Sequence, residues 1–172
     1  MLRSGTRGIL HPVLCILLLS LILQTPSRSQ SRLVTTQDLA RQAEVVAVGK
    51  VTALRSEWNA AHTMIRTLVT LSVDQYVKGG SSDRTFTLYV PGGEVGGVGE
   101  LYSDMATFRQ DENVVVFAQK DKQGRYRVAD GFQGKMTVVK DQVTGKLMVA
   151  GGKSLDELTN DVKRSLQLQQ RN

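Results

Sequence analysis

The sequence predicts a mainly β domain, built as a small closed or partly open antiparallel β-barrel with a short helix before it and a longer helix packed on it after it. Three observations lead to this fold class. Valine-rich segments alternate apolar and polar residues, turn residues separate these segments at short intervals, and a capping-box pattern stands at each end of the region. We expect one domain over residues 35–170, preceded by a linker over residues 30–34.

The predicted domain opens with a short helix and a strand. Asp38 follows Thr35 by three residues, which is the spacing of a capping box and predicts a helix of about two to three turns. Residues 44–54 are too rich in valine and too regularly alternating for a helix, so they predict a strand. Gly49 in its middle indicates a bulge or a close backbone approach, as where a strand bends round a barrel.

A second long strand is predicted after a polar connection at residues 55–62. Apolar side chains recur at every second position from Ile65 to Val73, which indicates a strand of about ten residues. Two long neighbouring strands of this kind are typical of a coiled hairpin at the start of a small barrel. Shorter strands are predicted at residues 85–90, 113–119, 126–129, 135–139 and 146–149.

The last predicted element is a helix that opens with a second capping box, Ser154 followed by Glu157, and runs to about residue 169. Its apolar residues form one narrow stripe, which predicts that the helix packs on the barrel: Leu155, Leu158, Val162 and Leu166. The other faces are polar, which argues against a helix lying in a membrane surface.

Residues 1–29 have the pattern of an export leader. Arg3 and Arg7 give a basic start, an apolar run follows, and small residues at Ser27 and Ser29 suit a signal peptidase. A retained membrane anchor is the alternative, but the apolar run is shorter than the roughly 20 residues that span a bilayer. Lipid attachment at Cys15 is disfavoured, because this cysteine lies inside the apolar run. We therefore expect an exported protein, periplasmic or secreted, without stable membrane insertion after cleavage.

Cleavage of the leader would change the net charge and the cysteine content of the protein. The whole chain has 22 basic and 16 acidic residues, and the leader holds three of the basic ones, so the mature net charge is 19 minus 16, or +3. This small surplus argues against a nucleic-acid partner, whose binding relies on many phosphate contacts. The only cysteine also leaves with the leader. A cysteine-free exported chain of this size is compatible with a bacterial envelope protein whose core needs no disulfide.

A glycine-rich segment is the most unusual local feature, because five of residues 92–100 are glycine. Closely spaced glycines can serve a hairpin that needs positive φ angles, which is the interpretation we favour, or can let a partner approach the backbone. A nucleotide loop is not indicated, since neither a helix nor a lysine motif follows. As candidate binding residues we single out Gly92, Gly93, Glu94, Val95, Gly96, Gly97 and, as an aromatic contact, Trp58.

The mature chain offers little for catalysis or metal binding. His62 would be its only histidine, and a metal site needs three or four ligands, so we predict no catalytic residue, no metal and no cofactor. A locally acidic region could in principle hydrolyse glycosides or bind calcium, although such charges are usually solvated: Glu94, Glu100, Asp104, Asp111 and Glu112. Tyrosines together with Trp58 could stack on sugars, although ordinary cross-strand packing is favoured.

Several sequence blocks resemble a family of exported bacterial proteins of largely unassigned activity. Across roughly residues 43–140 these blocks are AEVVAVGKV, TLVTLSVDQYVKG, VPGGEVGG, Phe108 followed by DENVVVFAQ, and GRYRVADGFQGK. A valine-rich first strand with an internal glycine, a long second strand ending in Lys-Gly and a trailing helix are also similar to netrin-like modules and tissue inhibitors of metalloproteinases. That similarity implies an oligonucleotide/oligosaccharide-binding (OB) type of barrel. Those inhibitors hold zinc through an amino-terminal cysteine, which the mature chain lacks, so no inhibitory residue is carried over.

These observations favour an exported, non-catalytic module that binds an envelope or secreted protein, such as a protease. The alternative is a barrel that binds a carbohydrate or another small molecule on an aromatic platform. A hydrolase that uses dispersed carboxylates ranks last. Clustered aromatic residues would favour the small-molecule alternative, an exposed glycine loop or unpaired edge would favour the protein-binding module, and an enzyme would require two acids converging in a cleft.

Overall fold

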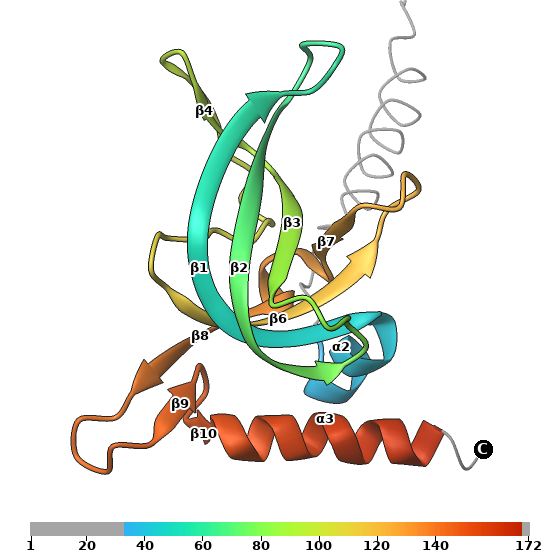
Figure 1. Cartoon of the computed structure of the whole chain (residues 1–172), viewed down its shortest axis with the longest axis vertical. Coiled ribbons are helices and arrows are strands. Elements are labelled where there is room, and N and C mark those ends of the chain that lie inside the picture. The colour runs from blue at the N-terminus through green and yellow to red at the C-terminus, as the bar shows by residue number, and fades with distance from the viewer. Residues whose placement is uncertain (1–32, 170–172) are drawn as a thin grey trace, which may run out of the picture. The chain divides into compact units, whose positions relative to one another are not determined.

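The computed structural model describes residues 33–169, which are mainly β, as predicted, with helices near both ends (Figure 1). The predicted leader at residues 1–29, most of the linker and residue 170 lie outside the described residues. In chain order the elements are α2 (Thr36–Gln42), β1 (Val45–Trp58), β2 (Ile65–Lys78), β3 (Thr85–Pro91), β4 (Gly93–Val95), β5 (Val98–Glu100), β6 (Asn113–Lys120), β7 (Tyr126–Val128), η1 (Gly131–Gly134), β8 (Lys135–Lys140), β9 (Leu147–Val149), β10 (Lys153–Ser154) and α3 (Leu155–Gln169).

The main sheet is antiparallel and strongly curved. Its strands follow the order β10-β9-β8-β6-β1-β2-β3, and β7 pairs with β6 beside this path. Because β1 and β2 bend along their length (Figure 1), strand β3 comes close to β7, and the rings of Phe86 and Tyr126 pack 4.9 Å apart between their centroids. Within residues 33–169 no backbone pairing joins β3 to β7. Side chains therefore fill the space between β3 and β7. We call this line of side-chain contacts between the two strands the seam.

Strand β1 is longer than the sequence predicted. Residues 55–58 were expected in a connection, but they continue the ladder with β2 until Trp58 lies opposite Ile65. The prediction was wrong because polar cross-strand pairs replace apolar ones in this half of the hairpin. Glu57 lies opposite Arg66 and accepts a hydrogen bond from its Nη2 at 2.7 Å. Strand β2 likewise runs for 14 residues instead of about ten.

Gly49 lies where the β1–β2 ladder changes register, between Val48 and Gly49. A Cβ atom at this glycine would lie 2.3 Å from the carbonyl oxygen of Ser72, so no larger residue fits without moving the neighbouring strand. The close backbone approach predicted for Gly49 is confirmed, and the ladder shifts its register at this residue. Both features allow β1 to pair with β2 along its whole length while its first half also pairs with β6.

Alternation along β1 and β6 produces two separate apolar cores, one on each face of the curved sheet. The core inside the curve contains Val45, Ala47, Val51, Val69, Leu71, Val73, Phe86, Leu88, Val90, Ala106, Val114, Val116, Ala118 and Val128. The core on the other face contains Leu39, Ala40, Ala43, Val46, Val48, Val115, Phe117, Ala129, Val138, Val149, Leu158 and Val162. The second core thus joins both helices to the sheet.

Side-chain caps are present at both predicted helix starts, and at α3 they form the reciprocal capping box. The amide of Asp38 donates to Thr35 Oγ1 at the start of α2, and at the start of α3 the amide of Ser154 donates to Glu157 Oε2 while the amide of Glu157 donates to Ser154 Oγ. The predicted apolar stripe of α3 faces the sheet, with Leu158 and Val162 buried in the second core. No helix within residues 33–169 is long and apolar enough to cross a membrane.

Candidate functional site

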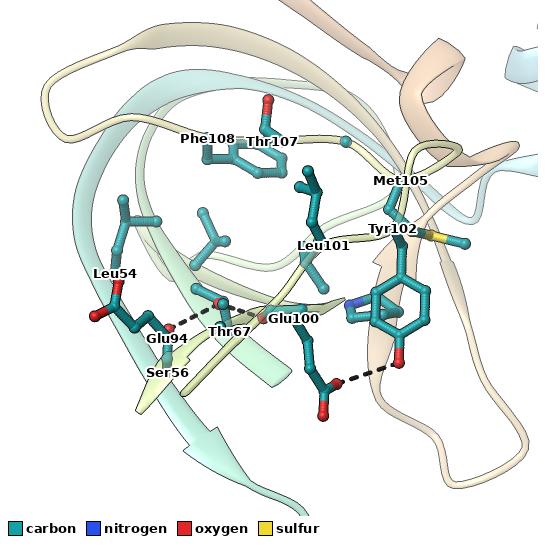
Figure 2. Close-up of a pocket in the computed structure, with 17 residues that line it drawn as sticks. Leu54, Ser56, Thr67, Glu94, Glu100, Leu101, Tyr102, Met105, Thr107 and Phe108 are labelled. Carbon is teal, nitrogen blue, oxygen red and sulfur yellow. Dashed lines mark hydrogen bonds between the residues drawn. The ribbon is translucent and has the colours of Figure 1, made fainter. Parts of the chain in front are cut away.

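The described residues contain a cavity of about 440 Å³ at the end of the curved sheet where β1, β2 and β3 meet the β4–β5 hairpin (Figure 2). Its wall is mostly apolar and is completed by the loop that follows β5. The lining residues are Leu54, Ser56, Thr67, Val69, Val90, Pro91, Gly92, Gly93, Glu94, Gly99, Glu100, Leu101, Tyr102, Met105, Ala106, Thr107 and Phe108. A cavity of this volume falls within the range of about 300–1,000 Å³ that is typical of ligand sites.

Two glycines bring the chain from β3 into the hairpin along the cavity wall. Gly92 and Gly93 have φ angles of 93° and 133°, which residues with a side chain rarely adopt. A Cβ at Gly93 would lie 2.4 Å from the hydroxyl oxygens of both Ser56 and Thr67. The glycines are therefore required by backbone conformation and by close packing, which confirms the interpretation favoured from sequence for this part of the segment.

A chain of hydroxyl groups crosses the same wall (Figure 2). Thr67 Oγ1 donates to the carbonyl oxygen of Gly92 at 2.7 Å, and it lies 3.0 Å from Ser56 Oγ. Because a hydroxyl group carries one proton, Ser56 is then the donor to Thr67. Both serine and threonine hydroxyls are thus engaged in holding the hairpin against β1 and β2.

Glu100 is held at the edge of the cavity by two donors. Its Oε2 atom accepts from the backbone amide of Ile65 at 2.9 Å and from the hydroxyl of Tyr102 at 3.2 Å. Desolvation, together with the neighbouring Glu100 carboxylate, raises the pKa of Tyr102. The phenol therefore stays protonated and remains a donor to Glu100 at neutral pH.

Exposed apolar side chains surround this cavity, a feature that sequence analysis missed. Leu101 is 85% exposed although it is part of the cavity wall, and Val98 on the adjoining strand is 49% exposed. Leu54 and Tyr102, which also line the cavity, are exposed as well. We call Leu54, Leu101 and Tyr102 the apolar rim, and Val98 lies next to it on the β4–β5 hairpin. Its members come from strand β1 and from the loop after β5, so no local sequence pattern relates them.

A largely buried ion pair fixes the loop that carries the cavity's outer wall. Lys135 Nζ donates to Glu112 Oε1, and their side chains are only 13% and 11% exposed. Thr137 donates to the same oxygen at 2.6 Å, and the Lys135 ammonium lies 5.5 Å from the ring centroid of Phe108, a cavity residue. Burial alone would raise the pKa of Glu112, but hydrogen bonds from Lys135, Thr137 and the Arg109 amide outweigh it and lower the pKa.

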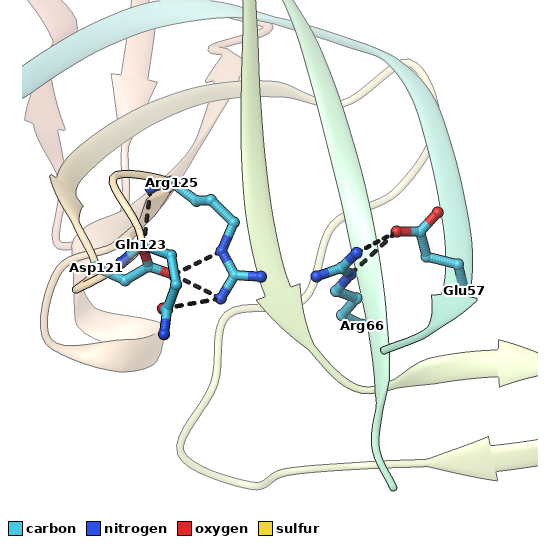
Figure 3. Close-up of polar contacts among 5 residues, drawn as sticks. All are labelled: Glu57, Arg66, Asp121, Gln123 and Arg125. Atoms are coloured by element: carbon cyan, nitrogen blue, oxygen red, sulfur yellow. Dashed lines mark hydrogen bonds and ion pairs between the residues drawn. The ribbon is translucent and has the colours of Figure 1, made fainter. Parts of the chain in front are cut away.

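A second polar cluster lies at the seam (Figure 3). Tyr89 on β3 has the guanidinium of Arg66 5.3 Å from its ring centroid and that of Arg125 5.1 Å from it. Arg66 is paired with Glu57 at 2.7 Å, and Arg125 with Asp121 at 2.8 Å. Because each guanidinium already has a carboxylate partner, this cluster is a structural bridge between β3 and the turn before β7.

The predicted binding residues are only partly brought together. Gly92, Gly93 and Glu94 line the cavity, whereas Val95, Gly96 and Gly97 form the hairpin end beyond it. Gly96 and Gly97 have φ angles of 59° and 80°, and a Cβ at either would meet nothing within 4 Å. Trp58 is not a lining residue and instead stacks on His62, with centroids 6.0 Å apart.

The acidic residues that sequence analysis noted do not converge as a catalytic pair. Glu94 and Glu100 both line the cavity, but their carboxylates point apart in Figure 2. Asp111 pairs with Lys50 at 2.7 Å, and Glu112 belongs to the ion pair with Lys135. Within residues 33–169, no three histidine, cysteine or acidic side chains are grouped as a metal ion would require.

Comparison with known proteins leaves the family open: no protein-family model and no curated protein matches this chain. The resemblances to the exported bacterial family and to netrin-like modules remain predictions.

Proposed function

We propose that this protein is an exported, non-catalytic module that binds another exported protein, such as a protease, through the apolar rim and the cavity inside it. The observation that carries the proposal is the position of Leu101, 85% exposed at the edge of a mostly apolar cavity. Single exposed apolar side chains are common on any protein surface, but three of them on the wall of one mostly apolar cavity favour a protein contact.

The β4–β5 hairpin supports the same proposal. Gly96 and Gly97 leave its end free of side chains, so a partner's backbone can approach closely there. Gly92 and Gly93 of the predicted binding segment have a different role from Gly96 and Gly97, because the first two are needed for the fold itself. We therefore place the contact surface at the apolar rim and the free end of the hairpin.

We also propose an OB-type barrel, related to netrin-like modules, as the scaffold of this binding module. Its support is the order β3-β2-β1-β6-β7 within the curved sheet, together with the side-chain contacts that bring β3 beside β7. In this proposal the seam completes the barrel through packed side chains. The cavity then lies at one end of the barrel, where loops between strands commonly form binding sites.

A photo-crosslinking experiment in the native host tests the protein-binding proposal. A photoreactive amino acid at Leu101 should give a covalent adduct with a specific exported protein. The matched control is the same amino acid at Val143, which is 93% exposed but lies in the β8–β9 turn. Adducts from both positions with the same proteins, or from neither, would contradict the proposal.

A small apolar ligand is the second candidate occupant, because the cavity volume of about 440 Å³ suits one. A carbohydrate is less well supported. Of Trp58 and the tyrosines that could form a stacking platform, Tyr102 lines the cavity, but Trp58 stacks on His62, Tyr76 packs on Phe86, and Tyr89 lies between two arginines. Mass spectrometry of native protein purified from its host would favour this candidate if it found a small molecule in place of a protein adduct.

A further inference from the structure

We propose that the segment received by the cavity has an apolar side chain flanked by basic side chains. This inference rests on the proposed function, since it states the chemistry of the partner segment at the same site. The inner wall of the cavity is apolar, because buried residues of the first core face it: Val69, Val90 and Ala106. An apolar side chain that replaces water against such a wall gains free energy.

The charged residues that line the cavity are all acidic. No lysine, arginine or histidine is among its lining residues, whereas Glu94 and Glu100 are. This imbalance is opposite to that of the expected mature chain, whose 19 basic and 16 acidic residues give a net charge of +3. The cavity mouth is therefore an acidic position on a basic protein, and it favours a cationic neighbour of the inserted side chain.

The two carboxylates differ in how they are held. Glu100 is oriented by the Ile65 amide and the Tyr102 hydroxyl, which occupy one of its oxygens. Glu94 is exposed, and no hydrogen bond or ion pair joins its carboxylate to another part of residues 33–169. By contrast, Glu57, Glu112 and Asp121 each have a basic partner within the fold. Glu94 is thus available to a basic side chain from outside.

Three peptides of equal length test this chemistry with the purified protein. They share glycine and serine ends and carry Lys-Phe-Lys, Glu-Phe-Glu or Lys-Ala-Lys at the centre. Binding is measured by fluorescence anisotropy at low and moderate salt. We expect Lys-Phe-Lys to bind at least about tenfold more tightly than either other peptide, with the advantage over Glu-Phe-Glu decreasing as salt is added.

Two variants localise the effect to the cavity. Glu94→Gln should weaken Lys-Phe-Lys binding about three- to fivefold, the size expected for an exposed charge pair. Its matched control is Asp74→Asn, which neutralises an exposed acid farther along β2. Gly99→Leu should abolish binding without unfolding the protein, because a Cβ there meets only the Gly93 carbonyl oxygen, at 4.0 Å. A thermal melt verifies that each variant is folded.

The outcomes separate this inference from the proposed function. Equal binding of Lys-Phe-Lys and Glu-Phe-Glu, equal binding of the two lysine peptides, or no binding at all would overturn the inference. If the Leu101 crosslink to a protein persists in that case, the binding module stands and only the chemistry of its partner segment is wrong. Loss of the crosslink as well would reject both.

Discussion

Gly93→Ala is the substitution whose effect can be worked out most fully from the structure. The new methyl group would lie 2.4 Å from Ser56 Oγ and from Thr67 Oγ1, and 3.0 Å from Ser56 Cβ. The backbone at this residue has a φ of 133°, which alanine rarely adopts. The variant must therefore move the hairpin, displace two hydroxyl groups, or do both.

The expected loss is the sum of three effects of the same sign. Backbone strain costs about 1–2 kcal/mol, overpacking against two strands about 1 kcal/mol or more, and disruption of the hydroxyl chain about 1 kcal/mol. Alanine recovers roughly 0.5 kcal/mol by restricting the unfolded chain. We expect the free energy of unfolding to fall by about 3 kcal/mol, which corresponds to a decrease in Tm of about 10 °C for a domain of this size.

Gly97→Ala is the matched control from the same glycine-rich segment. Its φ of 80° is also unfavourable for alanine, but a Cβ there meets nothing within 4 Å. Only the strain remains, so the loss should be about 1 kcal/mol or less. Urea unfolding followed by circular dichroism measures both variants. If Gly93→Ala were no less stable than Gly97→Ala, the close packing of the hairpin on β1 and β2 would be wrong.

Three further predictions concern the surroundings of the cavity and the first helix. Glu112→Gln should lower the free energy of unfolding by about 3 kcal/mol at neutral pH, because it leaves the buried Lys135 ammonium without its partner. In the parent protein the pKa of Glu112 is lowered, so this residue contributes fully to the free energy of unfolding above the ordinary pKa of 4.5, and the contribution is progressively lost at lower pH. Urea titrations between about pH 3 and 7 should therefore show a smaller loss of stability toward acid pH in Glu112→Gln than in the parent protein. Equal slopes of stability against pH would contradict this. Lys78→Met should lower the free energy of unfolding by about 1–2 kcal/mol in the same assay, because Lys78 Nζ donates to the carbonyl oxygens of Ala40 and Ala43 where α2 ends. An unchanged urea midpoint would show that these hydrogen bonds add nothing to stability. Leu101→Ser should leave Tm within about 1 °C of the parent, as should Val143→Ser, because both side chains are exposed; a large decrease for Leu101→Ser would mean that the rim is part of the core.

Local patterns in the sequence were sufficient where neighbouring residues decide the outcome. The helix N-caps at Thr35 and Ser154 were predicted correctly because their partners lie three residues away. The strand periodicity was also sufficient to place most of β2, β3 and β6, since burial of alternate side chains leaves a visible pattern. Gly49 was identified because glycine weakens a strand interior, so its presence within a regular strand usually marks a bulge or a close backbone contact.

Prediction failed where distant residues decide the outcome. Arg55–Trp58 were assigned to a connection because nothing local shows that Glu57 will lie opposite Arg66. The glycine-rich segment was recognised as unusual, but its two parts could not be told apart. Gly92 and Gly93 are packed against other strands, whereas Gly96 and Gly97 lie in open space. Trp58 was proposed as a contact beside the glycines, but it is not among the residues that line the cavity and stacks on His62 instead.

The sequence by itself determined the mainly β class, the two capped helices and the positions of most strands, because hydrogen bonding within a turn and alternation along a strand act over a few residues. The tertiary structure alone decided the curvature that brings β3 beside β7, the buried pair of Glu112 and Lys135, and the cavity with its apolar rim. Those features depend on contacts between residues far apart in the chain, and such contacts follow from register and packing that no single segment encodes.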